Sequence, residues 1–425
     1  MIKISAYTLH GLIGTKRLGF VSTHIAREKI FDGLNIPHTI LFSDPCLHKS
    51  NWTELLEKMG YRKYKNVVLE KSNIARHKPS LTKEEALQLI DSPIDVKEVY
   101  YSENGYVAAI ELSNEEVIYF TSNIFLWHKD NYADLYDDSG VLLSMNLLNG
   151  QWSIIEDGIQ KNHWDIMIEW LSMNTSQKDY YISDFSSELP MSFRKFFQNT
   201  GRVLHVMIHY NILSSQMVFK FPRWATLLTA SERLTEQLKK LDITSTFLPP
   251  IYVDKVLAKR YESVKKYCLV GANADIKRIN MAIDAFQQCF ENGQNVSLSI
   301  FGGLPDNVKV ENLPQNVEYK GFVSEVPYWE YEGYISCSKS ECFANAMVEA
   351  SSNGLVTVVS NVDLAHRFYK SISKDGVYLF DTTEELVDVI TMLTNKSVFS
   401  PFEIAERYQL NGVIEMYRNI FSNME

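Results

Sequence analysis

The stretch that says most about the fold is SCSKSECFANAMVEASSNGLVTVVSN, residues 336–361. The residues GYI just before it, together with its first residues, are typical of a strand that ends at a Ser-Lys-Ser turn. Glu341 then lies in the turn, Glu349 lies inside the helix that follows, and a second strand begins after Gly354. This order predicts a parallel sheet whose C-terminal edge, where α/β folds bind ligands, carries both carboxylates.

The same alternation of strands and helices extends on both sides of this stretch. An α/β series begins at KKYCLVGAN and ends at GVYLF, and an earlier series begins at the N-terminus. Between the two halves of the earlier series lie short alternating strands with ENG, DDSG and LNG turns, which predict an antiparallel meander. We therefore predict an N-terminal Rossmann-like acceptor domain (residues 1–91 and 159–250) with a meander inserted in it (residues 92–158). A C-terminal Rossmann-like nucleotide-sugar domain (residues 251–400) and a C-terminal helix that crosses back to the first domain (residues 401–425) follow.

The composition is that of a globular protein and narrows the function classes. The chain has 425 residues, of which 45% are hydrophobic, and a formal net charge of −10, which argues against a nucleic-acid partner. The N-terminus does not resemble a signal peptide and no run is long enough to span a membrane, so we expect a cytoplasmic protein. The five cysteines show no CxxC spacing, and three of them lie in or beside apolar runs, which favours free, reduced thiols.

A polar loop in LVGANADIKRINMAIDAF, residues 269–286, carries Lys277 and Arg278 just before a helix. Cations beside a helix N-terminus form an anion site, because the free N–H groups and the helix dipole add to the charge. Gly302 and Gly303 follow a strand and permit close backbone approach to a ligand. Taken singly, these features are also compatible with a solvated basic pair and an ordinary turn.

The block from KKYCLVGAN to SNGLVTVVSN resembles the C-terminal half of the retaining GT-B glycosyltransferases of family 4. Their signature, S-x-x-E-x-F-x-x-x-x-x-E-A-x-x-x-G, is matched in full from Ser338 to Gly354, with the two glutamates at Glu341 and Glu349. The N-terminal stretch GFVSTHIAREKIFDGLNIPHTILFSD and the meander resemble a narrower branch, the enzymes that glycosylate serine-rich adhesins or wall teichoic acid. The resemblance implies a GT-B fold, two Rossmann-like domains facing a cleft with the meander inserted in the first.

The resemblance also implies roles for single residues. Glu349 would accept hydrogen bonds from the ribose of a UDP-sugar, Glu341 would contact the sugar, and Lys277 would neutralise the diphosphate as the leaving group departs. His209 matches a histidine near the sugar, and Gly14 and Gly19 match a loop over the phosphates. Further donor contacts would come from Arg278, Gly302 and Gly303, and from the backbone amides of Phe343, Ala344 and Asn345. No metal or other cofactor is expected, and the sequence has no D-x-D cluster at a strand end.

Several positions depart from the family pattern and keep a second interpretation open. The family usually has an arginine where this chain has Ala272, a second histidine at Ile212 and an acidic residue at Val21. Cys342 and Ala344 replace a glycine pair that flanks Phe343. These departures favour a non-catalytic subunit that stabilises a partner glycosyltransferase and helps it hold its acceptor, whereas the intact glutamate pair favours an enzyme.

The reading that accounts for most of these features is a retaining transferase. It would move a hexose or N-acetylhexosamine from a UDP-sugar to a hydroxyl acceptor, either a Ser/Thr-rich protein or a polyol-phosphate or glycan chain. The sequence leaves open whether the chain binds a second glycosyltransferase subunit or forms a homo-oligomer. It also leaves open a peripheral position at a membrane. A nucleotide-sugar epimerase is disfavoured, and the first α/β unit lacks the G-x-G-x-x-G pattern of a dinucleotide site.

Overall fold

The computed structural model describes most of the chain and divides it into two compact units. One unit comprises Met1–Arg17, Ile36–Val206 and Trp224–Thr226, and the other comprises Leu18–Asn35, Met207–Arg223 and Leu227–Glu425. The predicted domain limits stay a prediction. The described residues are 4–10, 19–43, 56–57, 60–67, 81–88, 96–101, 105–113, 117–119, 126–127, 132–137, 140–146, 151–156, 159–184, 189–209, 221–271, 275–305, 307–323, 325–373 and 375–421.

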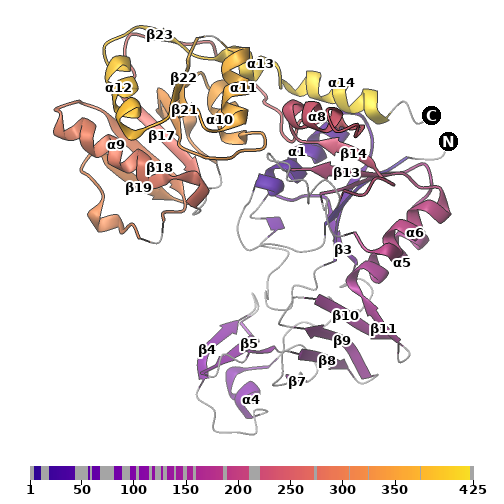
Figure 1. The fold of residues 1–425 in the computed structure, drawn as a ribbon. Coiled ribbons are helices and arrows are strands. Elements are labelled where there is room, and N and C mark those ends of the chain that lie inside the picture. The colour runs from indigo at the N-terminus through magenta and orange to yellow at the C-terminus, as the bar shows by residue number, and fades with distance from the viewer. Residues whose placement is uncertain are drawn as a thin grey trace. The chain divides into compact units, whose positions relative to one another are not determined.

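The C-terminal half is built on a six-stranded parallel sheet (Figure 1). Its strand order is β19-β18-β17-β20-β21-β22, so the chain starts in the middle, runs to one edge, and returns to build the other half. This is the doubly wound order in which the reversal leaves a ligand crevice beside the first and fourth strands. The strands are β17 (Lys266–Gly271), β18 (Ser297–Gly302), β19 (Val317–Gly321), β20 (Gly333–Ser336), β21 (Val356–Ser360) and β22 (Val377–Phe380).

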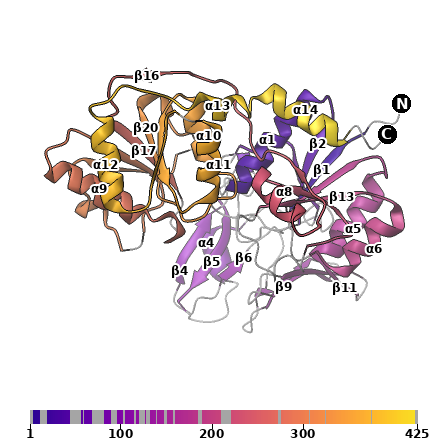
Figure 2. The same cartoon turned by 45° about the horizontal axis from the view of Figure 1, so that its top comes forward.

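Helices cover both faces of this sheet (Figures 1 and 2). One face is covered by α9 and α12, which contact each other, and the other by α10 and α11, which both contact α13. Because each face is covered, the strands are buried on both sides, and β20 and β21 are buried at every residue. The helices are α9 (Ile279–Glu291), α10 (Asn345–Ser352), α11 (Leu364–Ile372), α12 (Thr383–Leu393) and α13 (Phe402–Glu406), with 3₁₀ turns η2 (Asp275–Lys277), η3 (Val310–Asn312) and η4 (Tyr328–Glu330).

A seven-stranded sheet follows the same winding rule in the N-terminal half. Its order is β15-β14-β13-β12-β1-β2-β3, again with the first strand inside the sheet, and β1 pairs in parallel with both β2 and β12. Its strands are β1 (Ala6–His10), β2 (His38–Phe42), β3 (Tyr64–Asn66), β12 (Tyr180–Ser183), β13 (Leu204–Ile208), β14 (Thr226–Thr229) and β15 (Thr246–Phe247).

The segment between β3 and β12 holds the predicted antiparallel strands, arranged as two sheets. A three-stranded sheet has the order β4-β5-β6, and its buried residues pack with Ala86 of α4 (Lys83–Gln88). A five-stranded sheet has the order β11-β10-β9-β8-β7. The strands are β4 (Val96–Tyr101), β5 (Val107–Leu112), β6 (Val117–Tyr119), β7 (Leu126–Trp127), β8 (Tyr132–Asp137), β9 (Gly140–Asn146), β10 (Gln151–Glu156) and β11 (Ile159–Asn162).

The last helix, α14, packs on the first, α1. The rings of Phe31 and Tyr417 meet edge to face with centroids 5.8 Å apart, and both side chains are buried. The remaining helices and short strands are α1 (Gly19–Gly33), α5 (His163–Asn174), α6 (Met191–Thr200), α8 (Glu232–Lys239), α14 (Leu410–Phe421), β16 (Arg260–Tyr261) and β23 (Val398–Phe399). In the described part of the chain, every helix is too short or too polar to cross a membrane.

Acid is expected to weaken the N-terminal sheet through His205 on β13. Burial lowers the pKa of His205 to about 4, from an ordinary 6.5, so the folded protein keeps this imidazole neutral where the unfolded chain protonates it. The free energy of unfolding therefore falls as the pH drops below 6.5, by about 2 kcal/mol at pH 5 from this residue alone. Comparing the pH dependence of unfolding for the natural protein and His205→Gln isolates the effect, and parallel curves would contradict it.

Candidate functional site

Two loops meet at the point where the strand order of the C-terminal sheet reverses. One follows β17 and the other follows β20, and these two strands pair in parallel, so both loops leave the same edge of the sheet. The loops are joined directly, because the backbone N–H of Lys339 donates to the carbonyl oxygen of Ile276 over 2.8 Å. Side chains placed on either loop, Lys277 and Glu341 among them, are therefore brought together.

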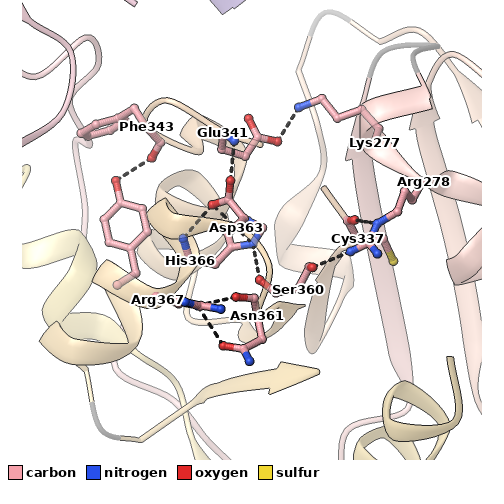
Figure 3. Close-up of polar contacts among 11 residues, drawn as sticks. Lys277, Arg278, Cys337, Glu341, Phe343, Ser360, Asn361, Asp363, His366 and Arg367 are labelled. Atoms are coloured by element: carbon pink, nitrogen blue, oxygen red, sulfur yellow. Dashed lines mark hydrogen bonds and ion pairs between the residues drawn. The ribbon is translucent and has the colours of Figure 1, made fainter. Parts of the chain in front are cut away.

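Lys277 and Glu341 form an ion pair between the two loops (Figure 3). The ammonium group of Lys277 donates to Oε1 of Glu341, and the two side chains keep only 24% and 19% of their surface exposed. Two groups predicted to bind a nucleotide sugar thus contact each other across the loops. An anion that reached Lys277 would have to compete with this carboxylate.

The N-termini of α9 and α10 border the same edge. Each helix is preceded by a residue in the left-handed region, Arg278 with φ 48° and Ala344 with φ 58°, and neither makes a side-chain cap. Among the described residues, none accepts a hydrogen bond from the N–H groups of Ala344, Asn345 or Ala346. Uncapped N–H groups and the positive ends of two helix dipoles add to the Lys277 charge and favour an anion here.

A buried tyrosine fixes the orientation of the peptide that begins α10. The hydroxyl group of Tyr369, which is 1% exposed, donates to the carbonyl oxygen of Phe343 over 2.6 Å. A trans peptide holds its C=O and N–H on opposite sides, so the N–H of Ala344 points away from Tyr369. The ring of Phe343 is buried and packs on Tyr369 and Tyr408. The peptide that carries the predicted backbone donors is therefore held in place by packing and a hydrogen bond among buried aromatic side chains.

The side chain of Arg278 points toward the ends of β20 and β21. Its Nε atom donates to the carbonyl oxygen of Cys337 over 2.6 Å, and its Nη2 atom donates to the Ser360 hydroxyl over 2.5 Å (Figure 3). The guanidinium group thereby ties the start of α9 to the residue after β20 and to the end of β21. The position of Arg278 is consistent with a structural brace for the loops, and its predicted diphosphate contact stays a prediction.

Asp363 accepts a hydrogen bond from the backbone of Glu341. The sequence prediction did not include Asp363. Its Oδ1 atom caps α11 by accepting from the N–H of His366 over 2.9 Å, and its Oδ2 atom accepts from the N–H of Glu341 over 2.5 Å. Asp363 is 1% exposed, and burial lowers the pKa of neighbouring His366, which keeps that imidazole neutral. An aspartate directly before LAHRFYK is an N-cap signal, so the helix start was readable from the sequence, but the contact with Glu341 was not.

The second glutamate of the motif also has a buried partner. Glu349 lies in the second turn of α10, and its Oε2 atom accepts a hydrogen bond from the hydroxyl of Tyr328 over 3.1 Å. Tyr328 begins the 3₁₀ turn η4, just before β20, and is 5% exposed. The sequence prediction found Glu349 but not Tyr328, which contacts it only through the fold.

Gly302 and Gly303 close the edge of the sheet beside β17. The N–H of Gly303 donates to the carbonyl oxygen of Gly271 over 3.0 Å, and Gly302 has φ 104°. A Cβ atom on Gly302 would lie 1.9 Å from that same oxygen, which leaves no room for any side chain. The two glycines thus let the backbones of β18 and β17 approach closely, and the predicted approach to a ligand stays a prediction.

The other predicted site residues lie in the N-terminal half of the chain, and some of them are outside the described residues. His209 directly follows β13 and is half-buried, and Gly19 is the first residue of α1. Gly14, Ala272 and Ile212 lie outside the described residues. Cys342 follows Glu341 directly, and burial raises the pKa of its thiol to about 12, so it stays protonated and adds no negative charge at the site.

Comparison with known families places a glycosyltransferase domain on this site. Residues 265–396 match the family model described as glycosyl transferases group 1, which contains every site residue of the C-terminal sheet. Protein CapJ from Staphylococcus aureus is 30% identical over 166 residues, which cover 36% of this chain and 39% of CapJ. The chain thus spans well under half the length of this curated relative.

Solved structures match the chain over almost its whole length. The pneumococcal O-GlcNAc transferase GtfA, in complex with UDP and GlcNAc, is 15% identical, with a TM-score of 0.73 over 100% of this chain and 99% of GtfA. A mutant of S. aureus TarM, in complex with fondaparinux, alpha-GlcNAc-glycerol and UDP, is 17% identical, with a TM-score of 0.69 over 98% of this chain and 99% of TarM.

These likenesses confirm the predicted fold class. The chain has the GT-B fold, with two doubly wound sheets and antiparallel strands inserted in the first, and it carries a glycosyltransferase group 1 domain. The part of the chain that resembles the glycosyl transferases group 1 is residues 265–396, which hold the site at the edge of the C-terminal sheet. Membership of family 4 and a retaining mechanism stay predictions.

Proposed function

We propose that this protein is a retaining glycosyltransferase that moves a hexose or N-acetylhexosamine from a UDP-sugar to a hydroxyl group. One observation carries the proposal: Lys277, Glu341 and two uncapped helix N-termini meet at the strand-order reversal of the C-terminal sheet. In doubly wound sheets that edge binds the ligand, and the positive charge there suits a diphosphate.

The proposed donor contacts follow from where each residue stands. Lys277 and the amides of Phe343, Ala344 and Asn345 would hold the diphosphate, and Gly302 and Gly303 would leave room beside it. Glu341 would release Lys277 and accept hydrogen bonds from the sugar, while Glu349 would accept from the ribose hydroxyls. His209 would contact the sugar, and Gly14 and Gly19 would border the phosphates.

The proposed reaction exchanges one glycosidic bond for another. The bond between the anomeric carbon and the β-phosphate oxygen breaks, and UDP departs with the bonding electrons. The acceptor oxygen bonds to the anomeric carbon on the same face, and its proton passes to the departing phosphate oxygen. Negative charge grows on the diphosphate as the bond breaks, so Lys277 and the helix N-termini stabilise the transition state more than the ground state. With this charge in place we expect the reaction to need no metal.

The proposed acceptors and partners rest on what related proteins are said to do. GtfA is described as an O-GlcNAc transferase, and TarM is bound to alpha-GlcNAc-glycerol. A Ser/Thr-rich protein and a polyol-phosphate or glycan chain are accordingly the two acceptor classes that we propose. A GtfA/B complex resembles this chain, with a TM-score of 0.70, and supports a second glycosyltransferase subunit as a partner. The cytoplasmic location stays a prediction from the sequence.

UDP binding and turnover test the donor directly. Calorimetry is expected to give micromolar binding of UDP, and one of UDP-glucose, UDP-GlcNAc and UDP-galactose is expected to be hydrolysed. Glu349→Ala is expected to weaken UDP binding roughly tenfold or more, because each hydrogen bond to a charged group contributes about 1.5–3 kcal/mol. Glu384→Ala, which removes an exposed glutamate from α12, is the matched control and leaves binding unchanged.

Two outcomes would contradict the proposal. Absence of UDP binding at millimolar concentration would reject a UDP-sugar donor and favour the non-catalytic subunit instead. Equal weakening by Glu349→Ala and Glu384→Ala would leave a donor site but move it away from α10. Thermal unfolding of each variant separates a binding defect from loss of the fold.

A further inference from the structure

The contact between Tyr328 and Glu349 joins the segment that precedes β20 in the sequence to the helix that follows it. Tyr328 begins η4, which precedes the strand, and Glu349 lies on α10, which follows it. The 3.1 Å hydrogen bond runs from the Tyr328 hydroxyl to Oε2 of Glu349. Burial, together with the negative charge of Glu349, raises the pKa of Tyr328 well above its ordinary value, so this hydroxyl keeps its proton and donates at every physiological pH.

The segment that carries Tyr328 is held firmly by the sheet. The N–H of Glu332 donates to the carbonyl oxygen of Lys266 over 2.9 Å, and the Glu332 carboxylate accepts from the N–H of Lys265 over 2.6 Å. Tyr331 packs edge to face on Phe301, with ring centroids 5.9 Å apart. These contacts fix η4 against β17 and β18, so the Tyr328 hydroxyl is a fixed donor.

A glutamate that lacks such a hydrogen-bond donor is expected to bind a diol weakly. Its side chain turns about several bonds, and holding it in one rotamer costs about 1–2 kcal/mol of conformational entropy. A carboxylate has about four acceptor positions, so it can accept from a tyrosine and from two vicinal hydroxyl groups together. A hydrogen bond made before the ligand arrives means that the ligand does not have to order the side chain.

We propose that Tyr328 is a positioning residue that fixes the Glu349 carboxylate for the ribose diol and so makes the site selective for ribonucleotides over deoxyribonucleotides. The proposal rests on the donor site proposed above and adds to it a residue and a specificity. Tyr328 itself touches no substrate. Its hydroxyl sets the direction in which Glu349 presents its oxygen atoms.

Calorimetry with UDP and with 2′-deoxy-UDP tests this on the full-length protein. The natural protein is expected to bind UDP roughly tenfold or more tightly than 2′-deoxy-UDP, since the deoxy compound lacks one of the hydroxyl groups from which the charged Glu349 carboxylate would accept a hydrogen bond. Tyr328→Phe, which removes one oxygen atom, is expected to weaken UDP binding roughly tenfold and to leave 2′-deoxy-UDP nearly unchanged. The ratio between the two ligands therefore collapses only if the hydroxyl acts through the ribose.

Tyr331→Phe is the matched control, because it removes a hydroxyl group from the same segment, and that hydroxyl lies near Ser299 whereas the hydroxyl of Tyr328 contacts Glu349. It is expected to keep the natural ratio, as a purely structural effect would lower both affinities together. If the natural protein binds both ligands equally, the assignment of Glu349 to the ribose fails. A different result overturns only the role of Tyr328: the natural protein prefers UDP, Glu349→Gln abolishes this preference, and Tyr328→Phe keeps it. Tighter UDP binding by Tyr328→Phe would also overturn it.

Discussion

Replacing Lys277 by alanine is expected to lower kcat for sugar transfer from the preferred UDP-sugar about 10²- to 10³-fold, the range found when one preorganised donor to a developing negative charge is removed. Lys277 is the cation that stands between the two loops, and its charge acts where the leaving diphosphate becomes more negative. The loss should appear more strongly in kcat than in KM, because the interaction strengthens as the bond breaks. Initial rates over a range of donor concentrations measure both constants.

Two comparisons show whether the charge itself is responsible. Lys339→Ala removes an exposed lysine from the neighbouring loop and is expected to leave kcat unchanged. Lys277→Arg keeps the charge and is expected to retain far more activity than Lys277→Ala. An equal loss in both Lys277 variants would show that the exact shape of the contact with Glu341 matters more than the charge. Unchanged kcat in Lys277→Ala would remove Lys277 from the mechanism.

The C-terminal fold was readable from the sequence because its local signals agree. Residues 333–336 are uncharged and form a run short enough for a buried strand. A polar turn follows, and the helix ends close to Gly354, the residue before the next apolar run. Each transition has its own chemical marker, so β20, α10 and β21 appear where the sequence places them. The inserted segment was less specific. Alternating residues predict strands, but not which strands pair, and the structure divides the meander into two sheets.

The site was readable only where the chain itself brings residues to one sheet edge. Lys277 and Glu341 each follow a parallel strand, so the winding rule alone places them together. The direction of Arg278 depends on Ser360, which is 82 residues away in the sequence. The partners Tyr328 and Asp363 likewise reach the two glutamates through tertiary packing, which periodicity does not report. Sequence reasoning therefore finds the charged groups of such a site more readily than the side chains that hold them.

Replacing Gly302 by alanine is expected to lower the free energy of unfolding by about 3 kcal/mol or more, since both a special backbone conformation and a close backbone contact are violated. Gly302 has φ 104°, a value that residues with a Cβ atom rarely adopt. The added methyl would lie 1.9 Å from the carbonyl oxygen of Gly271, and a backbone atom in a paired strand cannot rotate aside as a side chain would.

Gly271→Ala provides the matched control for this effect, because it adds the same methyl to the facing strand. Its Cβ atom would meet its nearest neighbours at an ordinary 3.8 Å, among them Cγ of Lys277. We therefore expect thermal unfolding of Gly271→Ala close to that of the natural protein and a clearly lower midpoint for Gly302→Ala. Gly302→Ala should also lose UDP binding, since separating β18 from β17 moves the edge on which Lys277 stands. Equal midpoints in the two variants would mean that the edge yields, and the rigid support inferred for the anion site would then be wrong.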